Sequence, residues 1–262
     1  MLARVNLVVV ARPPRSLDAA IAALVRLQNL SLYEARSRLT GDPPRIVAIL
    51  GSADDAASLS RSLLAEGFVS LVLPGDRVVD DHGRAFVASL SFEPDTLVAT
   101  LRNGQTRSIP YDDITFLLRG LRSATQTTTR EETSKQFSPG KALLTGGLMM
   151  TSKKTTTTTT TNVTRQGFFY LHDRSGEPPL ALYEQRTNYG FLGPALQPSS
   201  AANFLTVVSM VRQRAPRARH DERLLRAPNL GAMPLPPPGT DPEGWKVDVA
   251  AAVLAASAEA LG

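Results

Sequence analysis

Histidines and paired acidic residues are the side chains of this sequence that could bind metal or move protons. Its histidines are His82, His172 and His220, and none has a second histidine or a carboxylate at metal-ligand spacing on a shared element. Asp80-Asp81-His82 is followed by Gly83, which is typical of a turn between strands. The chain has no cysteine, which excludes disulfides, thiolate metal ligands and cysteine nucleophiles. We therefore expect no metal site.

Motifs for phosphate binding and nucleophilic catalysis are also missing. Gly140-Lys141 suggests a phosphate loop, but Lys135 stands where that motif needs its first glycine and Ala142 where it needs Ser or Thr. No serine stands in a nucleophile elbow, and no glycine-rich dinucleotide loop follows a strand. We expect no catalytic residue and no cofactor. An enzyme of a class without a local motif remains a further alternative.

Arginines are dense in the region 212–226, and the chain as a whole carries a net charge of +5. The candidate anion-binding residues are Arg212, Arg214, Arg217 and Arg219. A phosphate-binding patch is one interpretation of this cluster. The other, which we favour, is a solvated helix end whose arginines complement the helix dipole. The charge permits a membrane surface or nucleic acid as partner, the nucleic acid being the less favoured.

The most unusual segment is apolar, contains glycines and spans residues 137–150, with lysines on both sides. Its candidate contact residues are Leu143, Leu144, Leu148, Met149 and Met150. An apolar tip ringed by lysines suits a membrane interface or a partner surface. The alternative, which we favour, is that the segment folds back and fills one end of its own domain. Threonine runs at 127–129 and 155–161 are typical of either a β-ribbon or a low-complexity linker.

The spacing of apolar residues in 1–75 predicts a β-α-α-β-α-β domain. Strands are expected at 5–11, 45–50 and 68–73, where β-branched and apolar residues run together. Helices are expected behind Ser16, Ser31 and either Ser52 or Asp54, each of which can cap a helix N-terminus. Ser31 and Glu34 have the spacing of a capping box.

Several short motifs in this stretch are shared with a known family. They are Val25-Arg26, Leu32-Tyr33-Glu34-Ala35-Arg36, Pro43-Pro44-Arg45-Ile46-Val47, Ala53-Asp54-Asp55-Ala56 and Leu64-Ala65-Glu66-Gly67. On these residues the first 74 positions resemble the C-terminal domain of the bacterial ribosomal stalk protein. The adaptor subunit of the Clp protease, which shares that fold, is a second resemblance. The resemblance implies protein binding, with Arg26, Tyr33 and Arg36 as partner-binding residues, although Tyr33 stands where the family usually carries a lysine.

Residues 76–226 are predicted to form an antiparallel β domain closed by a helix. Alternating apolar residues indicate strands, Asn103-Gly104 signals a hairpin turn, and Ser199 or Ser200 can cap the helix. At the level of topology this resembles a pleckstrin-homology-like barrel, with a simpler α+β sandwich as the alternative. A proline-rich linker at 227–240 and a C-terminal helix at 241–262 follow. Because a short alanine-rich helix is marginal alone, we expect this helix to dock on the body or on another subunit.

The sequence as a whole predicts an α+β, bacterial-type cytoplasmic protein. Its first apolar run is too short for a signal peptide, and no run is long enough to span a membrane. The leading function is a non-enzymatic protein-interaction or assembly module, an adaptor or scaffold, whose partner is another protein or a second copy. The alternative is a peripheral protein that binds membranes or anionic lipid through residues 137–150 and their flanking lysines.

Overall fold

The computed structural model describes residues 5–137 and 151–261, and the side chains of all of these except residues 82, 124–137 and 151–164. The chain has the predicted mixed α+β composition. It forms two compact units, of which the first comprises Met1–Arg122 with Gln166–Gly262 and the second comprises Ser123–Arg165. The sites considered below lie in the first unit.

The N-terminal part of the first unit contains a three-stranded antiparallel sheet and three helices. Its elements are β1 (Asn6–Arg12), α1 (Leu17–Gln28), α2 (Leu32–Leu39), β2 (Arg45–Leu50), α3 (Ala53–Ala65) and β3 (Val69–Pro74). The strand order is β2-β1-β3, with β1 in the centre. Ser16, Ser31 and Ser52 each cap a helix, and Ser31 with Glu34 forms the predicted capping box.

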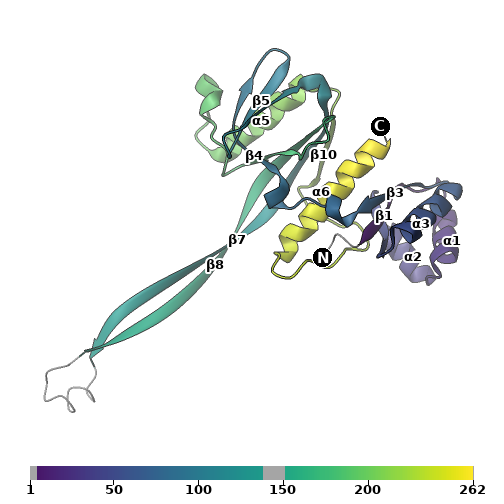
Figure 1. Ribbon diagram of the computed structural model, residues 1–262, viewed down its shortest axis with the longest axis horizontal. Coiled ribbons are helices and arrows are strands. Elements are labelled where there is room, and N and C mark those ends of the chain that lie inside the picture. The colour runs from purple at the N-terminus through teal and green to yellow at the C-terminus, as the bar shows by residue number, and fades with distance from the viewer. Residues whose placement is uncertain (1–4, 138–150, 262) are drawn as a thin grey trace. The chain divides into compact units, whose positions relative to one another are not determined.

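Strand β1 is buried on both faces, which explains its unbroken apolar sequence. Val8 and Val10 pack in one core with α1, α2 and α3. Leu7 and Val9 point to the opposite face, where they share a second core with the C-terminal helix α6 (Pro242–Leu261). Figure 1 shows α1–α3 on one side of this sheet and α6 on the other. The three strands are therefore the middle layer of a sandwich.

Helix α6 docks on the body of its own chain, one of the two expected outcomes. It contacts β1 and β3 on one side and the strand β10 (Arg219–Leu224) of the second sheet on the other. Trp245, Val249 and Val253 are buried in a core that includes residues of both sheets. Most of the helix surface is buried, so its alanines are close-packing residues and not a solvent-exposed face. No helix in the described ranges is long and apolar enough to cross a membrane.

Part of the segment predicted as a proline-rich linker is attached to the edge of the first sheet. The backbone N–H of Ile46 donates to the carbonyl of Leu230 at 2.6 Å, and Ala232 N–H donates to the carbonyl of Ile46 at 3.2 Å. The indole N–H of Trp245 donates to the carbonyl of Pro234 at 3.0 Å. These bonds place the approach to α6 beside β2.

The second sheet has seven strands and is mixed, which corrects the prediction of an antiparallel domain. Its strands are β4 (Ala85–Phe92), β5 (Thr96–Leu101), β6 (Thr106–Pro110), β7 (Ile114–Phe137), β8 (Thr151–Asp173), β9 (Leu180–Tyr183) and β10. Their order is β10-β7-β8-β9-β4-β5-β6, and the pairs β10–β7 and β4–β9 are parallel. Among the described residues this sheet does not close into a barrel.

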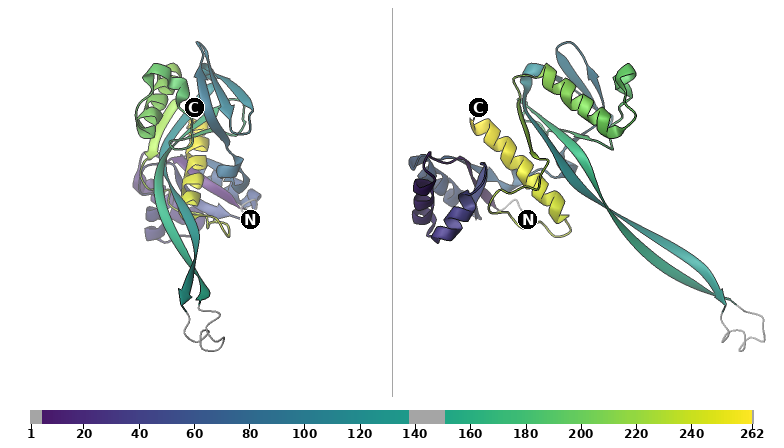
Figure 2. Two further views of the ribbon diagram at one scale, coloured as in Figure 1. Left: turned by 90° about the vertical axis from the view of Figure 1, so that its left-hand side faces the viewer. Right: turned by 180° about the vertical axis from the view of Figure 1, so that it is seen from behind.

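Helix α5 (Ser200–Arg214) covers part of the second sheet, as Figure 2 shows from behind. Phe204, Val207 and Val211 are its buried stripe, and Ser199, one of the two predicted candidates, is its cap. The predicted Asn103-Gly104 hairpin joins β5 to β6, and Gly104 has a φ of +83° there. Short 3-10 helices complete the described elements: η2 (Gly75–Arg77), η3 (Asp81–Gly83), η4 (Tyr111–Asp113) and η5 (Gly190–Ala195), which is kinked at Gly193.

Both threonine runs lie in strands, as the ribbon interpretation requires. Residues 127–129 belong to β7 and residues 155–161 to β8, and the two strands are neighbours in the sheet. The apolar segment between them, with its candidate residues Leu143, Leu144, Leu148, Met149 and Met150, lies outside the described residues.

The burial of α6 leads to a stability prediction. Replacing Trp245 with alanine should lower the free energy of unfolding by about 3–5 kcal/mol, because the indole is 3% exposed and its loss leaves a cavity in the shared core. The neighbouring change Lys246→Ala, at an exposed position of the same helix, should cost within about 0.5 kcal/mol. Urea denaturation followed by circular dichroism measures both. Equal, small costs would show that α6 does not contribute to the core.

Candidate functional site

The start of α2 presents two large apolar side chains to solvent. Tyr33 is 82% exposed and Leu32 beside it is 64% exposed. The chain's other four tyrosines are buried. An exposed tyrosine ring keeps most of its apolar area in contact with water. An exposed ring next to an exposed leucine is therefore typical of a contact surface.

Arg36 lies on the same face of α2 as these two residues, one turn along the helix. Its guanidinium is 4.0 Å from the carboxylate of Asp18 at the start of α1. Arg26 on α1 makes a separate ion pair, with Glu66 at the end of α3. The predicted partner-binding residues are thus all exposed. Tyr33 and Arg36 share one face, which we call the α2 surface and define as Leu32, Tyr33 and Arg36.

The four predicted anion-binding arginines have separate partners and do not form one patch. Arg214 stacks over Phe92, with 4.9 Å from its guanidinium carbon to the ring centroid. Arg217 lies 3.4 Å from the carboxylate of Asp112. The guanidinium of Arg219 donates to a backbone carbonyl of α6 at 2.9 Å. Arg212 alone reaches a hollow, described next.

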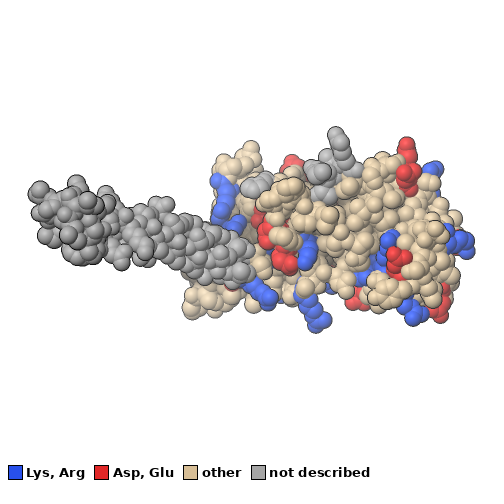
Figure 3. Space-filling model, turned by 90° about the horizontal axis from the view of Figure 1, so that it is seen from below, with Lys and Arg blue, Asp and Glu red and all other residues tan. Residues whose placement is uncertain are grey.

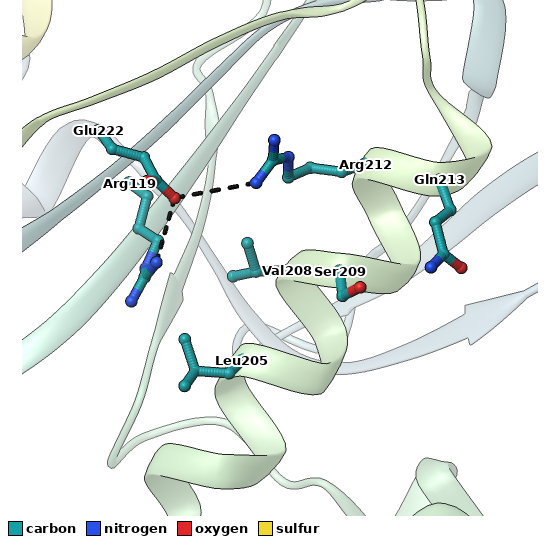
Figure 4. A pocket seen from close by; sticks show the side chains of 7 residues that line it. All are labelled: Arg119, Leu205, Val208, Ser209, Arg212, Gln213 and Glu222. Carbon is teal, nitrogen blue, oxygen red and sulfur yellow. Dashed lines mark hydrogen bonds and ion pairs between the residues drawn. The ribbon is translucent and has the colours of Figure 1, made fainter.

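This hollow of about 400 Å³, the α5 hollow, lies between α5 and the strands β7 and β10. Its lining residues are Arg119, Leu205, Val208, Ser209, Arg212, Gln213 and Glu222. In Figure 4, Val208 and Arg212 project from α5 toward the strands that carry Arg119 and Glu222. One wall of the hollow is therefore aliphatic and another is charged.

Three basic side chains surround the single carboxylate of this hollow. An oxygen of Glu222 lies 3.1 Å from Arg119, 4.0 Å from Arg212 and 3.6 Å from Nε2 of His220. Burial, together with the charge of Arg212, lowers the pKa of His220, so this imidazole is neutral at pH 7. Among the described residues, Nε of Arg119 and Nε2 of His220 are buried without a hydrogen-bond partner. Arg119 and Arg212 thus bring two positive charges to the hollow, against the one negative charge of Glu222.

A second hollow, of about 550 Å³, lies beside Arg45 and the segment 222–230. Arg45 is buried, and burial lowers its pKa. Its guanidinium already donates to the carbonyls of Ser37, Arg38 and Asn229. Because two of these carbonyls belong to the C-terminal turn of α2, Arg45 acts as a cationic cap of that helix. This arrangement is structural.

A cluster of four charged residues, two of them buried and two partly buried, connects α6 to the second sheet. Asp248 of α6 is 1% exposed and accepts two hydrogen bonds from Arg122 of β7, at 2.6 and 3.2 Å. Arg84 lies 2.8 Å from the same carboxylate and 3.0 Å from Asp81. Asp81 is also 3.0 Å from Arg122. Two arginines and two aspartates therefore balance one another inside the protein.

Two tyrosines extend this cluster across the sheet. The hydroxyl of Tyr183 donates to Asp81 at 2.6 Å and lies 3.0 Å from the hydroxyl of Tyr170, whose ring stacks under Arg84. Burial raises the pKa of both tyrosines, which stay neutral. Burial alone would lower the pKa of Arg122, but its bonds to Asp248 outweigh this effect and raise it. Every charge of the cluster has a partner, so the cluster can anchor α6 to the second sheet.

Sequence reasoning missed most of these residues for identifiable reasons. Asp81 was predicted in a turn, and η3 is a turn of helix there, but nothing local shows that its carboxylate points inward. Strand β10, with the sequence RHDERL, has no apolar alternation, so the sequence predicts no strand there. Arg119 and Glu222 were therefore not linked to Arg212. The parallel pairing of β10 with β7 is the feature that brings them together.

The charged groups on the described surface are mixed in sign. The face in Figure 3 shows acidic and basic side chains next to one another. Within the described ranges, no group of three or more histidines and carboxylates is arranged to hold a metal ion. Comparison of the chain with models of protein families, with curated proteins and with solved structures found no match.

The balance of the buried cluster can be tested by removing one charge. Asp248→Asn leaves two guanidinium groups facing one carboxylate, and should lower the free energy of unfolding by about 3–5 kcal/mol. The double change Asp248→Asn with Arg122→Gln restores neutrality, so its cost in urea denaturation should be well below the sum of the two single changes. Strictly additive costs would show that the four groups do not interact.

His172 provides a pH prediction. His172 is partly buried, and its buried Nε2 has no hydrogen-bond partner among the described residues. Desolvation of the ring, followed by the charge of Arg84, lowers its pKa from 6.5 to about 4. Between these values the unfolded chain binds a proton that the folded protein does not, so stability falls as pH falls from 6.5 to 4. This group alone should remove about 3 kcal/mol over that window.

The measurement compares the wild type with His172→Phe by urea denaturation at pH 7 and pH 4. Because carboxylates titrate in both proteins, the difference between them isolates the histidine. The wild type should lose about 3 kcal/mol more than the variant on acidification. Equal losses would show that His172 can be protonated in the folded protein.

Proposed function

We propose that this protein is a non-enzymatic interaction module, an adaptor or scaffold, that binds another protein through the α2 surface. The observation that carries the proposal is the exposure of Tyr33, at 82%, beside an exposed leucine on a firmly capped helix. The resemblance of residues 1–74 to the ribosomal stalk C-terminal domain supports the same class of function.

The residue types on this surface are those that contribute most at protein interfaces. Tyrosine and arginine are enriched among interface residues whose removal strongly weakens binding. A tyrosine buries a large apolar area and loses little side-chain entropy when it becomes fixed. Leu32 adds aliphatic area, and the ion pair of Arg36 with Asp18 supplies a polar edge. A partner with an apolar patch and acidic groups beside it would fit this arrangement.

The helix below the surface is held rigidly. The capping box fixes the start of α2, with Glu34 accepting from the backbone and the hydroxyl of Ser31 at 3.0 and 2.8 Å. Ala35 and Leu39 are buried against the first sheet's helical core, and Arg45 caps the last turn. Because the backbone is already ordered, binding would cost little conformational entropy beyond that of three side chains.

Site-specific photo-crosslinking tests this function directly. The photoreactive amino acid p-benzoylphenylalanine replaces Tyr33 in the full chain, and the protein is irradiated in cells of its natural host. A control protein carries the same group in place of Arg61, an exposed residue of α3. We expect position 33 to give one reproducible crosslinked protein. Position 61 should not crosslink to that protein.

The crosslinked protein is then purified, and its affinity for the wild type is compared with that for Tyr33→Ala. The substitution should leave the melting temperature almost unchanged, because the ring is exposed, and should weaken binding by about tenfold or more. An equal pattern of crosslinks at both positions, or unchanged affinity of Tyr33→Ala, would contradict the proposal.

A further inference from the structure

We propose that the α5 hollow binds a small carboxylate that carries an apolar tail. The hollow is at a different place from the α2 surface and involves none of its residues. It therefore adds a ligand site that does not depend on the proposed interaction function.

The charged residues of the hollow favour a ligand that carries one negative charge. Arg119 and Arg212 contribute two positive charges and Glu222 one negative charge. His220 faces the same carboxylate but is neutral at pH 7, and Asp221 next to it is paired with Arg223. One positive charge is left without a partner, so a monoanion brings the site to neutrality.

The donors of the hollow suit a planar carboxylate. Guanidinium groups bind carboxylates through two parallel hydrogen bonds. Arg119 uses one guanidinium nitrogen, Nη1, on Glu222 at 3.1 Å. Arg212 stands farther away, at 4.0 Å from Glu222, and its side chain is 51% exposed. A second carboxylate placed between the two arginines would complete hydrogen bonds that Glu222 alone leaves open.

The aliphatic wall indicates that the ligand has an apolar part. Leu205 is 47% exposed, and it lines the hollow together with Val208. Figure 4 shows both side chains on the same side of α5 as Arg212, so a charged head and an apolar tail would contact neighbouring residues. A volume of about 400 Å³ has the size of small-molecule sites. Inorganic anions would leave this wall in water.

Glu222 has a defined role in this site. Without a ligand, its carboxylate pairs with both arginines, which lowers the free-energy cost of keeping two guanidinium groups close together. An entering carboxylate must share those donors with it. Removing the charge of Glu222 should therefore strengthen binding.

The experiment is a titration of the full-length, isotope-labelled protein with hexanoate, followed by NMR chemical shifts of backbone amides. Parallel titrations use acetate, which lacks the tail, hexanol, which lacks the charge, and inorganic phosphate. We expect saturable shifts at residues of α5 and β10 with hexanoate, and affinities at least about fivefold weaker for the other three probes.

Variants of the same protein locate the site. Arg212→Gln and Arg119→Gln should each weaken hexanoate binding by about tenfold, because each removes a charge-assisted contact. Arg217→Gln, a matched change at an exposed arginine outside the hollow, should leave the affinity unchanged. Glu222→Gln should bind hexanoate several-fold more tightly than the wild type. If Arg119→Gln fails to fold, the exposed Arg212 decides.

Each contrary result would overturn the proposal. They are an absence of saturable shifts in the wild type, equal binding of hexanol or phosphate, equal affinity of Arg212→Gln and Arg217→Gln, and weaker binding by Glu222→Gln. Any of the first three results would show that the carboxylate, the apolar tail or the arginines do not contribute to recognition. The last result would show that Glu222 does not compete with the ligand.

Discussion

The rest of the fold depends on the ion pairs of one buried carboxylate, that of Asp248. Asp248 lies on α6, and the apolar residues of α6 pack in one core with residues of both sheets of the first unit. A carboxylate is costly to bury unless guanidinium groups are already in place, so α6 is stable in this position only when Arg84 and Arg122 face it. Arg122 belongs to β7 of the second sheet and Arg84 directly precedes β4, while the helix also packs on β1 and β3 of the first sheet. These two ion pairs therefore fix the register of a helix whose alanine-rich surface could slide.

This constraint has a consequence for function. The first sheet carries α1 and α2 on the face opposite α6, so the α2 surface is held by a sheet whose other face is closed by the rest of the unit. A partner bound at Tyr33 would thus be fixed relative to the N-terminal helices. The α5 hollow belongs to the second sheet, where β10 contributes both Glu222 to the hollow and a contact to α6. Two separate surfaces are built on elements that one helix stabilises.

The sequence predicted the local elements well and the long-range contacts poorly. Helices behind Ser16, Ser31 and Ser52 and the apolar strands have strong local signals, since caps and periodicity are properties of neighbouring residues. The α2 surface was partly predicted, because Tyr33 and Arg36 lie on one short helix. Strand β10 has no apolar alternation, and its pairing partner β7 is about a hundred residues away. The buried cluster likewise joins residues 81, 84, 122 and 248, whose proximity exists only after folding.

Native-state hydrogen exchange tests most directly whether α6 and both sheets form one cooperative unit. The slowest amides of α6, β1 and β9 should exchange with the same opening free energy, since none of these elements can lose its packing while the others keep theirs. In Asp248→Asn the opening free energies of all three elements should fall by the same amount. If α6 amides exchanged through a much smaller opening free energy than those of β1, and the substitution changed α6 alone, the helix would be a peripheral attachment and this account of the fold would be wrong.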